Sequence, residues 1–160
     1  MFSKRGGVSS GKTRQSAMEY ASGLIARAEQ YSAGLALKLQ KKGYGKAEIH
    51  AVVEALSETG MLDDMRYSRL WLESRIKRKA ASPRELIYAL CGKGINRSTA
   101  AAALKDALTG GEEISACEMS LLKRFSEKNG YDGESYDGGL RQKFRHEGFS
   151  ADVLERYFDE

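Results

Sequence analysis

The stretch LQKKGY at residues 39–44 recurs twice in related form, as LCGKGI at 90–95 and FRHEGF at 144–149. In each copy a large apolar residue begins the stretch, a glycine stands fifth, and another apolar residue follows that glycine. A glycine just past a helix end takes a positive φ without the penalty of a Cβ, and in the Schellman arrangement the next residue packs back on the last helical turn. The three stretches therefore predict three similar helix ends, stopped by Gly43, Gly94 and Gly148.

The residues around these glycines also repeat, at intervals of about 50 residues, which indicates tandem copies of one structural unit. Apolar residues occupy matched positions before the glycines (Leu35, Leu86, Leu140) and after them (Ile49, Ala100, Leu154). The expected helix starts also fit this repeating unit. Ser82-Pro83-Arg84-Glu85 forms a capping box with proline at the first helical position. Ser32, Asp137 and Ser150 stand at the corresponding starts of other helices.

Apolar residues spaced three or four apart predict three amphipathic helices in each unit. The expected helices span residues 15–29, 32–42, 46–59, 65–79, 83–92, 97–108, 113–128, 138–147 and 151–158. The sequence thus predicts an all-α protein, an elongated array of three tandem three-helix repeats at residues 15–60, 61–110 and 111–160. A flexible basic arm is expected at residues 1–14, and a mobile connection at 129–139.

A competing motif lies at residues 6–13, where GGVSSGKT matches the phosphate-loop pattern G-x-x-x-x-G-K-[ST]. A working phosphate loop follows a buried strand and opens a helix within an α/β domain. Only MFSKR precedes Gly6, and no later stretch reads as a set of buried strands. The stretch is therefore expected to belong to the basic arm, and a nucleotide-hydrolysing enzyme rests on this motif alone.

Composition narrows the class of protein further. The chain has 160 residues, 30% of them charged, and a single proline, as expected for a soluble, largely helical protein. No apolar run approaches the roughly 20 residues of a membrane span, and the N-terminus lacks a signal-peptide pattern. Cys91 and Cys117 are far apart and lack metal-ligand spacing. These features predict a cytoplasmic protein with no metal, no cofactor and no membrane contact.

Positive charge is concentrated near the middle of the chain, whereas the C-terminal third is acidic. A set of cations interrupted only by Glu73 comprises Arg66, Arg69, Arg75, Lys77, Arg78 and Lys79. Clusters of this kind bind phosphates or an acidic protein surface without reading base sequence. The alternative interpretation is an ordinary solvated helix face.

Other residues near this set have a structural interpretation. Asp63 and Asp64 precede the helix expected at 65–79, where carboxylates cap the first turn and favour the helix dipole. Tyr67 and Trp71 could stack on bases, but their spacing within an apolar stripe favours a place in the core. His50 and His146 have no neighbours suited to catalysis and are expected at the surface.

Two stretches resemble the RecX family of bacterial regulatory proteins. GMLDDMRYS at residues 60–68 is similar to the family's Gly-hydrophobic-Leu-Asp-Asp-x-Arg/Phe-aromatic-Ala stretch. SPRELIYALCGKGI at residues 82–95 is similar to its Gly-Pro-x-x-Ile-x-x-Glu-Leu-x-x-Lys-Gly-Ile stretch, with Ser82 in place of the first glycine. The likeness covers residues 15–160.

The resemblance implies a non-enzymatic protein that binds RecA recombinase and the RecA filament on single-stranded DNA, and restrains strand exchange and ATP hydrolysis in DNA repair and the SOS response. The chain is expected to act as a monomer, with the basic set as its contact surface. The second hypothesis is a helical DNA-binding protein of the transcription-factor type, because helix pairs joined by a glycine turn also occur in helix-turn-helix units. Its second helices are poor in residues suited to base edges, which disfavours that hypothesis.

Overall fold

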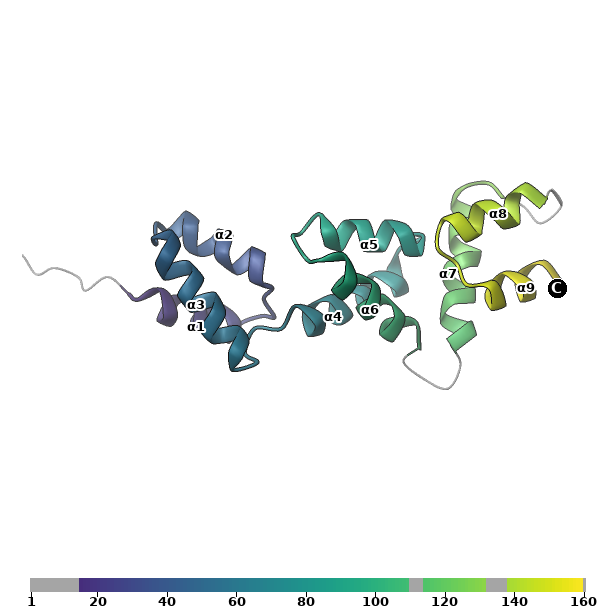
Figure 1. The fold of residues 1–160 in the computed structure, drawn as a ribbon. Coiled ribbons are helices and arrows are strands. Elements are labelled where there is room, and N and C mark those ends of the chain that lie inside the picture. The colour runs from purple at the N-terminus through teal and green to yellow at the C-terminus, as the bar shows by residue number, and fades with distance from the viewer. Residues whose placement is uncertain (1–14, 110–113, 132–137, 160) are drawn as a thin grey trace, which may run out of the picture.

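The computed structural model describes residues 15–109, 114–131 and 138–159, and these ranges form nine α-helices and no strands. The helices are α1 (Ala17–Ile25), α2 (Ser32–Lys42), α3 (Lys46–Glu58), α4 (Asp64–Arg78), α5 (Pro83–Cys91), α6 (Arg97–Thr109), α7 (Ile114–Lys128), α8 (Gly138–His146) and α9 (Ala151–Asp159). Figure 1 shows three groups of three in a row: repeat 1 (α1–α3), repeat 2 (α4–α6) and repeat 3 (α7–α9). The predicted all-α, elongated array is confirmed.

Two sequence expectations concern residues that the structure leaves undescribed. The basic arm at residues 1–14, with the GGVSSGKT stretch, lies outside the described residues. So do residues 132–137, the greater part of the connection expected at 129–139. Of that connection, Asn129–Tyr131 is described as a turn after α7, in which Gly130 takes a φ of 69° and the Tyr131 N–H donates to the Ser126 carbonyl over 3.0 Å.

The three glycine stretches adopt one backbone conformation. Gly43, Gly94 and Gly148 have φ values of 91°, 91° and 94°, in the left-handed region that favours glycine. The next residue in each case donates its N–H back to the helix: Tyr44 to Leu39 O (3.2 Å), Ile95 to Leu90 O (3.3 Å) and Phe149 to Phe144 O (3.2 Å). The apolar partners in these pairs are all buried, so each stretch stops a helix and closes a small core contact.

The helix starts are set by local caps. Ser16 and Ser82 each form a complete capping box, with Glu19 and Glu85 at the third helical position. Ser150 Oγ accepts the Val153 N–H at the start of α9. Ser32, in contrast, is the first residue of α2 and not its cap: Tyr31 occupies the cap position and makes no side-chain cap bond.

The first helix is shorter than the sequence predicted. The apolar pattern predicts a helix over residues 15–29, but α1 ends at Ile25. The chain turns there, and the Gln30 side-chain amide donates to the carbonyls of Leu24 (3.4 Å) and Ala28 (3.0 Å). A side chain outside the helix thus binds the Leu24 carbonyl near its end, and the following turn brings Glu29 to Arg66 and Tyr31 to Tyr67 of repeat 2.

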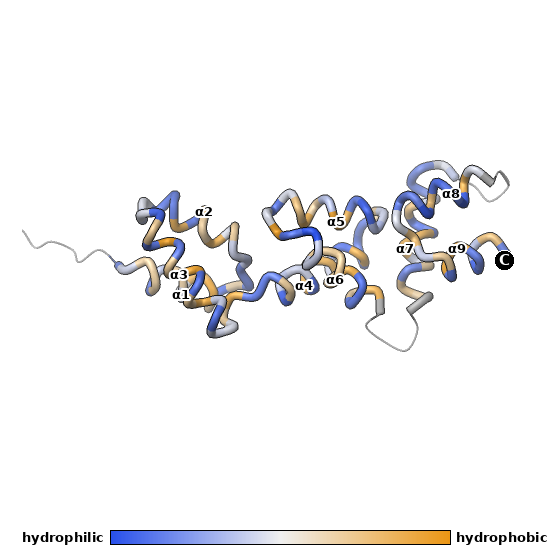
Figure 2. Tube along the Cα trace, in the orientation of Figure 1, coloured by the Kyte–Doolittle hydropathy of each residue, from blue (hydrophilic) through white to orange (hydrophobic). Residues whose placement is uncertain are grey.

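Apolar side chains gather in two separate cores, and Figure 2 shows hydrophobic and hydrophilic positions mixed along each helix, as amphipathic helices require. The core of repeat 1 is small and contains Ala17, Ala21, Leu35, Leu39, Tyr44, Ile49, Val52, Leu56 and Leu62. A single continuous core serves repeats 2 and 3, from Leu72 in α4 to Leu154 in α9. Phe144, fully buried, contacts the rings of Phe125, Tyr131, Phe149 and Tyr157 within it.

The repeats meet through their helix-stop glycines. A Cβ added to Gly94 in repeat 2 would lie 2.7 Å from the Cβ of Ala33, at the start of α2 in repeat 1. A Cβ added to Gly148 in repeat 3 would lie 3.2 Å from the Cβ of Pro83, at the start of α5 in repeat 2. Each of these two glycines therefore follows a helix end and allows a close approach to the preceding repeat, so the same kind of contact forms both joints of the array.

Candidate functional site

Helix α4 carries the predicted basic set, and two neighbouring carboxylates fix its start. Asp63 caps the helix, because its Oδ1 accepts the backbone N–H groups of Met65 (2.9 Å) and Arg66 (3.0 Å). Asp64 instead accepts the N–H of Ser32 over 2.7 Å, across the boundary between repeats 1 and 2. Its carboxylate thus serves the start of α2, which lacks a cap of its own. Both residues have structural roles, as the sequence indicated, but Asp64 acts on the preceding repeat.

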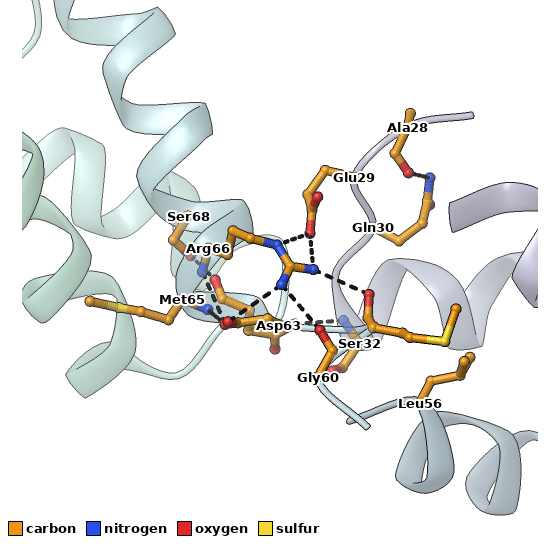
Figure 3. A network of polar contacts seen from close by, with 12 residues as sticks. Ala28, Glu29, Gln30, Ser32, Leu56, Gly60, Asp63, Met65, Arg66 and Ser68 are labelled. Atoms are coloured by element: carbon orange, nitrogen blue, oxygen red, sulfur yellow. Dashed lines mark hydrogen bonds and ion pairs between the residues drawn. The ribbon is translucent and has the colours of Figure 1, made fainter. Parts of the chain in front are cut away.

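Arg66 lies at that boundary and contacts repeat 1 (Figure 3). Its Nε and one Nη lie 2.8 and 2.7 Å from Glu29 Oε1, and the guanidinium also donates to the carbonyls of Gly60 (3.1 Å) and Met61 (3.2 Å). The hydrogen bond with Glu29 raises the pKa of Arg66 above its ordinary value, although desolvation of the guanidinium acts in the opposite direction. The sequence grouped Arg66 with the other cations of α4, but its donors are directed to groups within the protein.

The remaining cations of the set are exposed. Arg69 is close to Glu73, with 3.9 Å between Nε and Oε1, and its side chain is 50% exposed. The guanidinium of Arg75 lies 4.9 Å from the centre of the Trp71 ring. Lys77, Arg78 and Lys79 complete the C-terminal turn around buried Ile76. We call Arg75, Lys77, Arg78 and Lys79 the basic end of α4; cations there also favour the negative end of the helix dipole.

The aromatic residues of α4 belong to a packed cluster. Tyr67 and Trp71 are half-buried and pack against the core of repeats 2 and 3. The Tyr31 ring of repeat 1 lies 4.6 Å from the Tyr67 ring, and Lys93 Nζ lies 5.5 Å from Tyr31 and 5.8 Å from Trp71. Burial raises the pKa of Tyr67. These rings are core elements with a covering cation, in agreement with the structural interpretation of the sequence.

Repeat 3 anchors the C-terminal end of α4. Arg124 in α7 donates to the carbonyl of Ile76, and Lys128 Nζ donates to the carbonyl of Ala80 over 3.1 Å. Carbonyls in the last turn of a helix and just beyond it lack partners within the helix, so these bonds hold the end of α4 in place. The sequence offered no signal for these contacts, because they join residues that lie 48 positions apart. The basic end is thus presented on a fixed backbone.

The histidine and cysteine side chains of the described residues are dispersed over the fold. Within residues 15–109, 114–131 and 138–159 there is no group of three or more His, Cys, Asp or Glu placed to hold a metal ion. Cys91 and Cys117 are free thiols, His50 is exposed beside Glu54, and His146 Nδ1 lies 2.7 Å from an Nη of Arg84. In the part of the chain that the structure describes, no helix combines the length and apolarity needed to span a bilayer.

Known proteins resemble this chain both in sequence and in fold. The family model described as RecX, second three-helix domain, matches residues 63–104, which contain α4, α5 and the first part of α6. A regulatory protein RecX of Treponema pallidum (strain Nichols) is 29% identical over 120 residues, covering 75% of this chain and 72% of its own length. The corresponding protein of Chlorobium limicola is 26% identical, covering 89% and 87%.

Solved structures agree on the fold. The crystal structure of RecX from Lactobacillus salivarius matches with a TM-score of 0.62 and 17% identity, covering 89% of this chain and 94% of that chain. A second RecX crystal structure matches with the same TM-score over 90% of this chain. The family model, the curated relatives and the shared three-helix architecture all indicate similarity to RecX proteins. In sequence and in fold, the chain is thus similar to RecX regulatory proteins.

Proposed function

We propose that this protein binds RecA recombinase and the RecA filament on single-stranded DNA, and mainly inhibits strand exchange and ATP hydrolysis without catalysis of its own. The basic end of α4 is the observation that carries the proposal. Arg75, Lys77, Arg78 and Lys79 are exposed, at the end of a helix whose two ends are held by repeats 1 and 3. The family resemblance supports RecA as the partner.

Electrostatics supports a filament as the target. The filament contains a DNA phosphate backbone, and clustered Lys and Arg side chains bind phosphates or acidic protein surfaces with an affinity that falls steeply with salt. Arg69 and Glu73 are close enough to offset each other, so Arg69 contributes less than the basic end. Arg66 is left out of the proposed contact surface, because Glu29 and two backbone carbonyls occupy its donors.

The shape of the protein supports contact along a filament. An array of repeats presents an extended surface, since each repeat mainly contacts its neighbours. We propose the units 15–60, 61–110 and 111–160 as its building blocks, a division supported by α1–α3, α4–α6 and α7–α9 falling within those bounds. We also propose that the protein acts as a monomer in the cytoplasm, where it would meet RecA and DNA.

The test measures ATP turnover and strand exchange by RecA on single-stranded DNA with substoichiometric amounts of this protein. We expect both rates to fall with the wild type and to recover with the triple variant Arg75→Glu, Arg78→Glu and Lys79→Glu. A control variant reverses three exposed cations of repeat 1, Arg27, Lys41 and Lys46, with the same change in net charge. Unchanged RecA activity with the wild type would contradict the proposal, and sequence-specific retention of a DNA duplex would favour a transcription factor instead.

A further inference from the structure

A groove of about 720 Å³ lies between repeats 2 and 3, away from α4. Helices α5 and α6 of repeat 2 and the start of α9 in repeat 3 form its walls. Its apolar lining comes from Ile87, Ala101, Leu104 and Leu108. The volume is within the range of pockets that bind small ligands or several side chains of a peptide.

Cations surround this apolar lining. Arg84, Arg97 and Lys105 line the groove, and the guanidinium carbons of the two arginines lie 5.6 and 5.9 Å from the centre of the Tyr88 ring. Tyr88 is 54% exposed, so its ring is accessible in the groove. A hydrogen bond with Arg84 and the charges of both arginines lower the pKa of Tyr88, which agrees with a positive potential at this position.

The groove also holds two carboxylates, one fewer than its three Lys and Arg side chains. Glu118 is 4% exposed and already accepts the N–H and the hydroxyl of Ser150, over 2.6 and 2.9 Å. Asp152 lines the groove in the first turn of α9 and is exposed. His146 also lines it and is adjacent to Arg84. The groove thus has an apolar floor and, among the residues that line it, an excess of one cation.

We propose that this groove binds an acidic peptide segment that carries aliphatic side chains between its carboxylates. Arginine forks bind carboxylates in a bidentate way, and an apolar floor of Ile, Leu and Ala fits aliphatic side chains. Single-stranded nucleic acid fits less well, because bases stack on free aromatic faces and both arginines lie over the Tyr88 ring. The occupant is therefore a segment of a partner protein.

This inference goes beyond the proposed function, because the groove and the basic end of α4 share no residues. Charge reversal at one site therefore leaves the other intact, and the two can be tested separately. The same independence provides a control: the Arg75, Arg78 and Lys79 triple variant retains full binding at the groove.

The experiment measures binding of a labelled synthetic peptide of alternating Glu and Leu by fluorescence anisotropy, with the full chain. We expect Arg97→Glu to weaken binding by roughly tenfold, since an ion-paired hydrogen bond is lost and a repulsion is gained. Arg97 is the first residue of α6, where a carboxylate suits the helix dipole, so the fold is retained. Arg145→Glu, at an exposed position on α8 outside the groove, is the matched control and leaves binding unchanged.

A second variant tests the apolar floor. Ala101 is exposed on α6, and Ala101→Trp fills the groove without disturbing the core. We expect this variant to weaken peptide binding to a similar extent while the helical circular dichroism stays unchanged. A peptide with Ser in place of Leu binds weakly to the wild type, and one with Lys in place of Glu does not bind.

Two results would overturn the proposal. One is no binding of the Glu-Leu peptide, or binding that Arg97→Glu and Ala101→Trp leave unchanged. The other is preferential binding of an oligothymidylate in the groove, with the same sensitivity to both variants, which would assign the groove to nucleic acid. Both measurements use the same protein and the same buffer.

Discussion

The two joints between repeats are built from different interactions. At the first joint, between repeats 1 and 2, the two cores are separate. The repeats are connected there by polar bonds, of Arg66 with Glu29 and of Asp64 with the Ser32 N–H, and by the Tyr31 ring, which packs against the core of repeats 2 and 3. At the second joint, one hydrophobic core continues from α4 to α9. Polar bonds also occur there, since Ser82 Oγ donates to Glu147 Oε2 over 2.7 Å, but they accompany the shared core.

The two joints share one kind of contact, but they differ in how strongly they couple the neighbouring repeats. Both joints place a helix-stop glycine against the start of the middle helix of the preceding repeat. Burial of apolar area contributes most of the stability of a domain, whereas exposed ion pairs contribute little and are screened by salt. Repeats 2 and 3 are therefore expected to unfold as one unit, while repeat 1 is coupled to them more weakly through polar bonds and the Tyr31–Tyr67 contact.

The largest effect is expected from Phe144→Ala in the shared core. Phe144 is fully buried among other aromatic rings, so its loss costs about 3 to 5 kcal/mol in the free energy of unfolding. Hydrogen exchange should show faster opening of α4–α9 together, with α1–α3 unaffected. Leu35→Ala, in the core of repeat 1, is the matched change and should accelerate exchange in α1–α3 alone. Faster exchange confined to α7–α9 in the Phe144 variant would contradict a shared core.

A smaller effect is expected from Gly94→Ala at the first joint. The new Cβ combines a left-handed backbone with an approach of 2.7 Å to Ala33, and together these cost about 2 to 4 kcal/mol in the free energy of unfolding. Gly60→Ala is the control, because Gly60 has a φ of 70° with no atom within 4 Å of the added Cβ. It costs only about 1 kcal/mol. Denaturant unfolding measures both, and equal costs would show that the close approach to Ala33 contributes nothing.

Arg66→Gln tests the polar part of the first joint. The variant loses the ion pair with Glu29 and the bonds to the Gly60 and Met61 carbonyls, so repeat 1 should move more freely relative to repeat 2. Small-angle X-ray scattering should show a broader distribution of interatomic distances, and high salt should produce part of the same change in the wild type. Arg69→Gln, beside Glu73 on the same helix, should leave the distribution unchanged. A rigid Arg66→Gln variant would mean that the Tyr31–Tyr67 contact holds the joint without Arg66.

The smallest expected effect is a shift in the pKa of one side chain, Tyr88, near the second joint. Arg84 is the main cause of the lowered pKa of Tyr88, so Arg84→Gln should raise that pKa toward its ordinary value of 10.0. In the wild type, tyrosinate at position 88 therefore forms at a lower pH than in the variant. Absorbance at the tyrosinate band, taken as the difference from the corresponding Tyr88→Phe protein, measures the shift. An unchanged pKa in Arg84→Gln would place the guanidinium away from the ring in solution.

The sequence predicted the parts of the fold that depend on neighbours in the chain. The stops at Gly43, Gly94 and Gly148, the cap at Ser82 and the cap at Asp63 each involve residues a few positions apart, so their pattern is visible in one stretch. The end of α1 was predicted wrongly, because the chain turns after Ile25, where the Gln30 side chain, outside the helix, binds the Leu24 carbonyl.

The candidate site was less predictable from sequence, because charge along a chain does not show which cations find partners. Arg66 and Arg69 look alike in sequence, yet the partner of Arg66 lies 37 positions away and is reached only through the fold. The bonds from Arg124 and Lys128 to α4, and the approach of Arg97 in α6 to Tyr88 in α5, likewise depend on the packing of one helix against another.

Binding of the protein to preformed RecA filaments on single-stranded DNA tests the central claim most directly. Labelled wild-type protein should bind the filament, with an affinity that falls steeply as salt is raised. The Arg75, Arg78 and Lys79 reversal should weaken binding at least about tenfold, whereas the Arg27, Lys41 and Lys46 reversal, with the same net charge, should have a much smaller effect. Equal binding by the two triple variants, or no binding of the wild type, would contradict the claim that α4 carries the contact.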